Sequence, residues 1–255
     1  MDYASVCYKK SCISQVIIRI DFLEFIDSKA LFDEDIERSL IVNFPKKGMQ
    51  QIIRFQTMNF TVDPSGAKTE GSTQEGLQQE FSNFDGNKIV LSNKFIVLEL
   101  NKYSKYEIEL TKLFPVLRNL MTRTRLTAMR TGIRYINMFE KNGIKPQKGY
   151  FNSPVSALAD SKICNAGKAV PIRAMALNEF VVDDMRLNFR YGQYNQQYPR
   201  PIKQVSFVLD YDCFCEEPLS GYDGIVEHIN KGHDAIQELF ENSITDKLRK
   251  VMTDE

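Results

Sequence analysis

The feature that most constrains the fold of this chain is the alternation of apolar and polar residues in four separate segments. Successive side chains of a strand point to opposite faces of its sheet, so this two-residue period predicts half-buried β-strands. The segments are residues 14–25, 51–62, 128–139 and 204–214. Strands spread along the whole chain predict a sheet assembled from distant parts of the sequence.

Helical spacing follows the strands in each half of the chain. Ser104 to Thr122 carries apolar residues on one face, and a second apolar stripe begins near Tyr222. The sequence therefore predicts an α+β fold with largely antiparallel sheet in two similar strand-then-helix halves. Helices are expected to pack on one side of the sheet, and a long helix is expected at the C-terminus.

A Gly/Pro/Lys-rich segment, Lys141 to Gly149, is the predicted boundary between the halves. It separates an N-terminal half, residues 1–140, from a C-terminal half, residues 150–255, and the two are expected to share one core. The polar stretch from Asp63 to Gly76 has almost no large apolar residue, and it predicts a mobile loop or a long hairpin connection.

Composition adds limits on partners and location. Hydrophobic residues make up 43% of the 255 residues, and the formal charge sums to zero, so only local clusters of charge could attract a nucleic acid. The five cysteines are odd in number and show no CxxC spacing, which favours reduced, buried thiols in the cytoplasm. The apolar runs are far shorter than a membrane-spanning helix needs, and no signal peptide is evident.

Four segments occur in a characteristic order along the chain. They are Tyr8–Phe22, the run Phe81-Ser82-Asn83-Phe84-Asp85-Gly86 leading through Val90-Leu91-Ser92 and Phe95 to Tyr103, the run Arg130-Thr131-Gly132-Ile133-Arg134-Tyr135-Ile136-Asn137, and a C-terminal His228 or His233 followed by Phe240 and Ser243-Ile244-Thr245. Together they resemble a sporadically distributed family of bacterial and archaeal proteins of about this length. The resemblance brings no established activity, cofactor or catalytic residue. The family's patchy distribution resembles that of antiviral defence and toxin–antitoxin genes.

The stretch from Leu110 to Phe139 contains no acidic residue and is rich in arginine. Arginine binds phosphates through a planar fork of N–H donors, so the stretch predicts a phosphate or nucleic-acid site. The alternative is that these arginines pair with Asp183, Asp184, Asp210 and Asp212 on neighbouring strands, and Arg134 is the one most expected to be structural. The candidate site residues are Arg118, Arg123, Arg125, Arg130 and Arg134.

Other chemistry-bearing residues lack a supporting pattern. His228 and His233 are five apart, which is not the spacing of a helical metal pair, and a helix-surface or capping role is expected for them. Asp210 and Asp212 share one strand face, but no third metal ligand is indicated. No phosphate-binding glycine loop or nucleophile elbow is present. The sequence therefore assigns no catalytic residue, no metal and no cofactor.

These observations favour a non-catalytic binding, regulatory or assembly protein in a bacterial defence or toxin–antitoxin system. Its expected partner is another protein or a second copy of the chain. The alternative is a nucleic-acid or nucleotide binder that uses the arginine-rich connector. A third hypothesis is a hydrolase or nuclease built on Asp210, Asp212 and His228.

Overall fold

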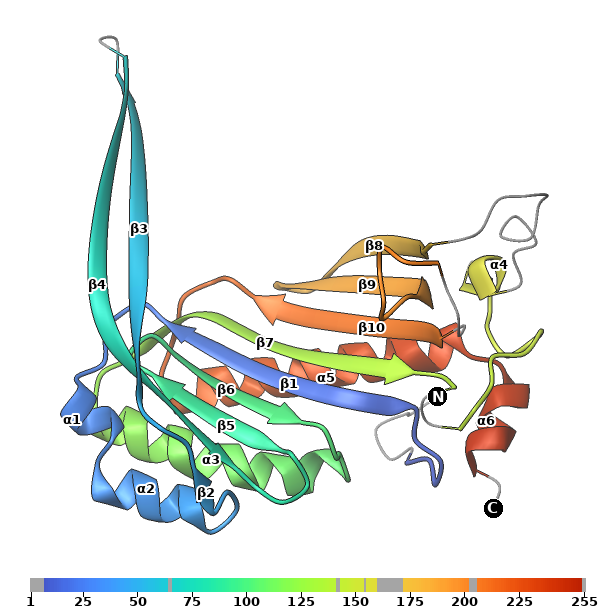
Figure 1. The fold of residues 1–255 in the computed structure, drawn as a ribbon, viewed down its shortest axis with the longest axis horizontal. Helices are drawn as coiled ribbons and strands as arrows, with labels where there is room; N and C mark the ends of the chain where they lie inside the picture. Colours follow the sequence, from blue (N-terminus) through green and yellow to red (C-terminus); the bar gives the residue numbers. More distant parts are fainter. Residues whose placement is uncertain are drawn as a thin grey trace.

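A single large sheet with helices on one of its faces forms the body of the protein (Figure 1). The computed structural model describes residues 7–63, 66–140, 143–153, 155–159, 172–201 and 206–253. The strands are β1 (Ile13–Phe22), β2 (Lys46–Lys47), β3 (Gln51–Asp63), β4 (Gly66–Ser82), β5 (Lys88–Ser92), β6 (Phe95–Leu100), β7 (Thr127–Met138), β8 (Ala174–Val182), β9 (Met185–Tyr194), β10 (Ser206–Cys215) and β11 (Leu219–Ser220). The helices are α1 (Ser28–Leu31), α2 (Glu34–Ile41), α3 (Tyr106–Arg123), α4 (Val155–Ala159), α5 (Tyr222–Ser243) and α6 (Asp246–Thr253).

The order of strands reveals two copies of one topology. The sheet runs β2-β4-β5-β6-β1-β7-β10-β9-β8, and every strand pair in it is antiparallel. In each copy a first strand, β1 or β7, pairs with the last strand of a three-stranded meander, β6 or β10. A long helix, α3 or α5, then follows. Since β1 and β7 are equivalent strands that pair antiparallel, an approximate twofold axis passes between them.

The sequence prediction of an antiparallel α+β fold with two strand-then-helix halves is confirmed, and so is the long C-terminal helix, α5. Both halves contribute to one continuous sheet. The predicted boundary at residues 141–149 follows β7, and residues 141 and 142 lie outside the described part of the chain. The repeated topology itself starts again one element earlier, at β7.

The helices cover the face of the sheet on which the strands present most of their large buried apolar side chains. In β1 these are Val16, Ile18, Ile20 and Phe22, and all four are buried. Helix α5 lies against β7 and β10, and Gly232 brings its backbone close to Ile133 and Cys213. No helix in the described residues is both long and apolar enough to cross a membrane.

A long antiparallel ribbon projects beyond the sheet, away from the side on which the helices lie (Figure 1). It consists of β3 and residues 66–77 of β4, which pair with each other and with no third strand of the described residues. At its base the Phe55 ring packs edge-on against Phe25, and Asn93 accepts a hydrogen bond from the backbone N–H of Leu77. We call this segment the ribbon. Of the two alternatives expected over Asp63–Gly76, the described residues form a long hairpin and not a mobile loop, because cross-strand backbone hydrogen bonds form there without large apolar side chains.

Candidate functional site: the open face and the tyrosine pocket

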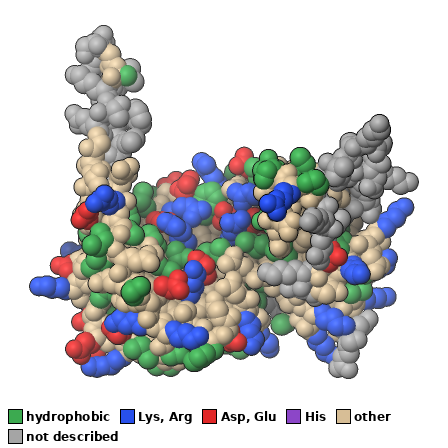
Figure 2. Space-filling view, viewed as in Figure 1, with side chains coloured by type: hydrophobic (Ala, Val, Ile, Leu, Met, Phe, Trp, Pro, Cys, Tyr) green, Lys and Arg blue, Asp and Glu red, His purple; other side chains and the backbone are tan. Residues whose placement is uncertain are grey.

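The face of the sheet opposite α3 and α5 is bare in the described part of the chain, and we call it the open face. It lies between the ribbon and the β8–β9 hairpin, where Figure 2 shows basic and acidic side chains intermingled. A shallow hollow of about 490 Å³ lies on it, lined by residues of β1, β4, β5, β6, β7 and β10. Apolar side chains such as Ile17, Val90 and Val97 form part of its floor.

Two of the predicted arginines, Arg130 and Arg134, lie on the open face and pair with acids of β10. The Nε and Nη2 groups of Arg134 donate to the two carboxylate oxygens of Asp210, each at 2.7 Å. This hydrogen bonding raises the pKa of Arg134. The Arg130 guanidinium stacks on the Phe214 ring at 4.5 Å and lies 4.0 Å from Asp212. The alternative interpretation, pairing with neighbouring-strand acids, therefore holds for both residues.

Every basic side chain that we assign to the open face lies within ion-pair distance of a carboxylate. The pairs are Arg19–Asp21, Lys88–Glu80, Lys88–Glu99, Arg130–Asp212, Arg134–Asp210, Arg186–Glu216 and Arg190–Asp210. Burial raises the pKa of Asp212 despite its neighbouring arginines. The open face is thus rich in charge, and its described side chains are close to neutral in sum and form no strongly positive patch.

The other three predicted arginines lie around helix α3, on the side of the molecule that carries the helices. Arg123 pairs with Asp33 at 2.9 Å and Asp35 at 2.6 Å, at the start of α2. Arg118 stacks over the Tyr222 ring at 4.7 Å, and Arg125 is exposed in the connection to β7. The structure therefore divides the five arginines between two opposite sides of the sheet.

The residues of the hydrolase hypothesis are not brought together. Asp210 is held by Arg134 on the open face, whereas His228 is buried on α5, which covers the other face. The His228 ring bonds the carbonyl of Gly224 and the Asp184 carboxylate, both at 2.8 Å. The surface role expected for His228 is therefore wrong: its ring ties the β8–β9 turn to α5. No cluster of three or more metal-ligating side chains occurs among the described residues.

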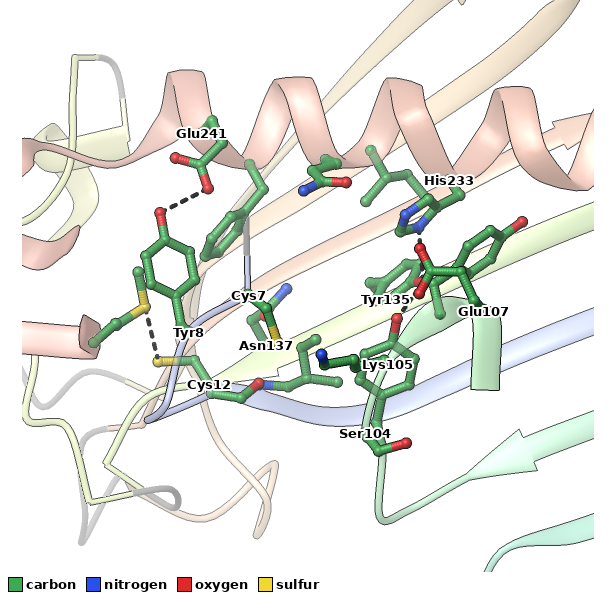
Figure 3. Close-up of a pocket in the computed structure, with 18 residues that line it drawn as sticks. Cys7, Tyr8, Cys12, Ser104, Lys105, Glu107, Tyr135, Asn137, His233 and Glu241 are labelled. Atoms are coloured by element: carbon green, nitrogen blue, oxygen red, sulfur yellow. Dashed lines mark hydrogen bonds between the residues drawn. The ribbon is translucent and has the colours of Figure 1, made fainter. Parts of the chain in front are cut away.

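A second concave site, which we call the tyrosine pocket, lies on the helix side of the sheet (Figure 3). It has a volume of about 250 Å³ and is lined by the segment that leads into β1, the end of β7, the start of α3 and the second half of α5. Its lining is mainly aromatic and apolar, and includes Tyr8, Tyr103, Tyr106, Tyr135, Ile236 and Phe240.

A chain of hydrogen bonds closes one end of the tyrosine pocket. The Tyr103 and Tyr135 hydroxyls lie 3.2 Å apart, and the Tyr135 hydroxyl lies 2.9 Å from His233 Nδ1. Burial raises the pKa of Tyr103 to about 12 and raises that of Tyr135 as well, so both phenols stay protonated at neutral pH. Burial also lowers the pKa of His233, whose ring stacks on Tyr106 at 3.7 Å. The three hydrogen-bonded side chains, Tyr103, Tyr135 and His233, are therefore uncharged near pH 7.

The opposite end of the tyrosine pocket holds a buried carboxylate, Glu241 (Figure 3). It accepts a hydrogen bond from the Tyr8 hydroxyl at 2.7 Å and one from Arg249 Nε at 2.8 Å. Its charge is thus compensated within the protein. Sequence reasoning missed this pocket because its tyrosines come from the N-terminal segment, the β6–α3 connection, α3 and β7, with no spacing that links them.

No family model, curated protein or solved structure matches this chain.

Proposed function

We propose that this chain is a non-catalytic binding protein, acting as an assembly or regulatory subunit, that holds a protein partner on the open face beside the ribbon. The observation that carries the proposal is the one-sided covering of the sheet. Helices α3 and α5 bury one face, while the described residues leave the other bare between two projecting β-hairpins.

The ribbon supports a partner because it lies outside the repeated architecture. One copy of the topology consists of β1, β4, β5, β6 and α3, and the other consists of β7, β8, β9, β10 and α5. Strand β3 has no counterpart in the second copy. An isolated two-stranded ribbon is marginally stable in water, so it gains from packing against another surface. A ribbon that stands beside a bare sheet face is therefore well placed to clasp a partner held there.

The charge pattern favours a protein over a nucleic acid. A polyanion binds by neutralising phosphates with unpaired basic groups, but the open-face arginines already have carboxylate partners. Phosphates would have to displace those carboxylates, which would remain next to the phosphates and repel them. A protein surface that carries both signs of charge can instead exchange partners with the existing pairs.

Cysteine chemistry supports placing the protein in the cytoplasm. Cys213 and Cys215 are buried thiols outside any disulfide, although they lie two residues apart on one strand. Burial raises the pKa of the Cys213 thiol to about 12, which makes it unreactive. Such thiols fit a reducing compartment. The role in defence or toxin–antitoxin systems and the family resemblance stay predictions.

The test is affinity purification of the tagged full chain from its source cells, with and without nuclease. The open-face variant carries Arg19→Glu and Lys88→Glu. The matched control carries Arg38→Glu and Lys231→Glu, which reverse the same types of charge on α2 and α5. We expect one protein to be retained by the wild type and the control, to resist nuclease, and to be lost from the open-face variant.

Reconstitution with that protein in purified form then confirms direct binding. Two results would overturn the proposal. One is equal retention of the partner by both charge-reversed variants. The other is retention of RNA or DNA alone, weakened steeply by salt, which would favour the nucleic-acid alternative.

A further inference from the structure

We propose that the tyrosine pocket binds a small, uncharged, planar aromatic molecule that carries one hydrogen-bonding group. This site is independent of the open face, because the pocket lies on the helix side of the sheet, between β1, β7, α3 and α5.

Size and lining determine the class of ligand. A volume of about 250 Å³ suits a molecule of one or two rings. Aromatic side chains surround it, among them Tyr8, Tyr103, Tyr135 and Phe240. Such rings favour stacked or edge-on contacts with another ring over contacts with a flexible aliphatic chain.

The charges around the pocket argue for an uncharged ligand. The carboxylate of Glu241 accepts a hydrogen bond from Tyr8, and Arg249 balances its charge. Lys105 and Glu107, both exposed among the lining residues, carry opposite signs. A charged ligand would lose its hydration without meeting a dedicated counter-charge, and burying an unpaired charge is expensive.

The hydrogen-bond chain accounts for the single polar group on the ligand. If His233 Nδ1 accepts from Tyr135, then Tyr135 accepts from Tyr103, and the Tyr103 oxygen keeps a lone pair for a ligand donor. If the imidazole carries its proton on Nδ1, the chain reverses and Tyr103 donates to a ligand acceptor. The neutral imidazole has both tautomers available, so the three hydrogen-bonded side chains can meet either a donor or an acceptor on the ligand.

The absence of tryptophan from this chain provides a direct assay. Indole is a planar two-ring molecule with one N–H donor, and its fluorescence can be excited where tyrosine does not absorb. We expect titration of the full chain into indole to give a saturable blue shift. For nine heavy atoms we expect a dissociation constant on the order of 0.1–1 mM.

Cys7 allows the pocket to be blocked chemically, because its exposed thiol is one of the lining groups. Labelling the wild type with N-phenylmaleimide should abolish the indole shift. A Cys7→Ser protein treated with the same reagent is the matched control and should retain the shift. Cys12 also lines the pocket, but it is buried and burial raises its thiol pKa to about 12, so it should not react.

Two tyrosine-to-phenylalanine variants test the role of the hydrogen-bond chain in binding. Tyr103→Phe keeps the ring and removes the hydroxyl, and it should weaken indole binding about 3- to 10-fold. Tyr194→Phe, on β9 outside the pocket, should leave binding unchanged. The proposal is overturned if the shift fails to saturate, if it survives labelling of Cys7, or if the two tyrosine variants bind alike.

Discussion

Asp210 holds two arginine side chains of the open face, Arg134 and Arg190, in position. Its side chain is 9% exposed, accepts two hydrogen bonds from Arg134, and lies 3.6 Å from Arg190. Asp210→Ala would leave Arg134 partly buried without its acceptor, and we expect it to lower the free energy of unfolding by roughly 1–3 kcal/mol. Asp21, the partner of Arg19, is more exposed than Asp210, so Asp21→Ala should lower the free energy of unfolding by less than about 1 kcal/mol. Equal losses for the two variants in urea unfolding would contradict this role of Asp210.

His233 should make stability depend on pH. Burial lowers its pKa below the usual 6.5, so the unfolded chain binds a proton more readily than the folded protein does. This contribution is present above pH 6.5 and is lost as the pH falls through the lowered pKa. Between about pH 7.5 and pH 5.5, we expect the unfolding free energy of the wild type to fall more steeply than that of His233→Gln. Parallel curves for the two proteins would show that burial does not hold the imidazole neutral.

Some residue roles were predictable from the sequence and others were not. Arg134 was expected to be structural because it lies within an alternating strand. The strand register places Asp212 opposite Arg134, and its guanidinium reaches diagonally to Asp210 instead. The Tyr103–Tyr135–His233 chain was invisible because it joins three elements distant in the sequence. The packing of α5 on β7 brings His233 to Tyr135, and the strand order β6-β1-β7 brings Tyr103, which follows β6, to the same place.

At the scale of elements, one glycine allows helix α5 to lie close to the sheet. A Cβ atom at Gly232 would lie 2.9 Å from Ile133 Cγ2 and 3.2 Å from Met185 Cε, whereas one at Gly224 meets nothing within 4 Å. Alanine favours a helix over glycine by up to about 1 kcal/mol, so Gly224→Ala should stabilise the protein. Gly232→Ala should give no such gain, and Gly232→Val should cost about 1–3 kcal/mol. Thermal unfolding of the three variants tests this order, and a stabilising Gly232→Ala would contradict it.

The ribbon should be dispensable for folding and necessary for binding. Thr57 pairs with Ser72, so residues 58–71 can be replaced by an Asn-Gly turn that keeps the contact between Phe55 and Phe25. We expect the unfolding free energy to change by less than about 0.5 kcal/mol, because the deleted part pairs only within itself. Retention of the protein partner should fall at least several-fold. A large loss of stability would show instead that the ribbon belongs to the folded core.

Element prediction succeeded where hydrophobic periodicity was strong, as in β1, β7 and β10. Over the polar residues after Asp63 it left a loop and a long hairpin as alternatives, because backbone pairing in a ribbon leaves little trace in a sequence without large apolar side chains.

At the scale of the whole molecule, the sequence predicted two similar halves but not how they join. The join follows from β1 and β7, which pair antiparallel at the centre and make one sheet from two copies. Their pairing could not be derived from either strand alone, because alternation shows which face is buried and not which strand lies alongside. One consequence is a sheet with a covered face and a bare one, and the bare face is the basis of the proposed function.

The proposed function requires the open face, and not the helix side, to hold the partner. Lysine labelling of the full chain, alone and in the purified complex, tests it most directly when the modified residues are quantified by mass spectrometry. Lys88 lies on the open face and Lys231 on the exposed side of α5, and both form ion pairs with nearby glutamates. We expect the partner to slow labelling of Lys88 several-fold and to leave labelling of Lys231 unchanged. Protection of Lys231, with Lys88 labelled as fast as in the free chain, would contradict it.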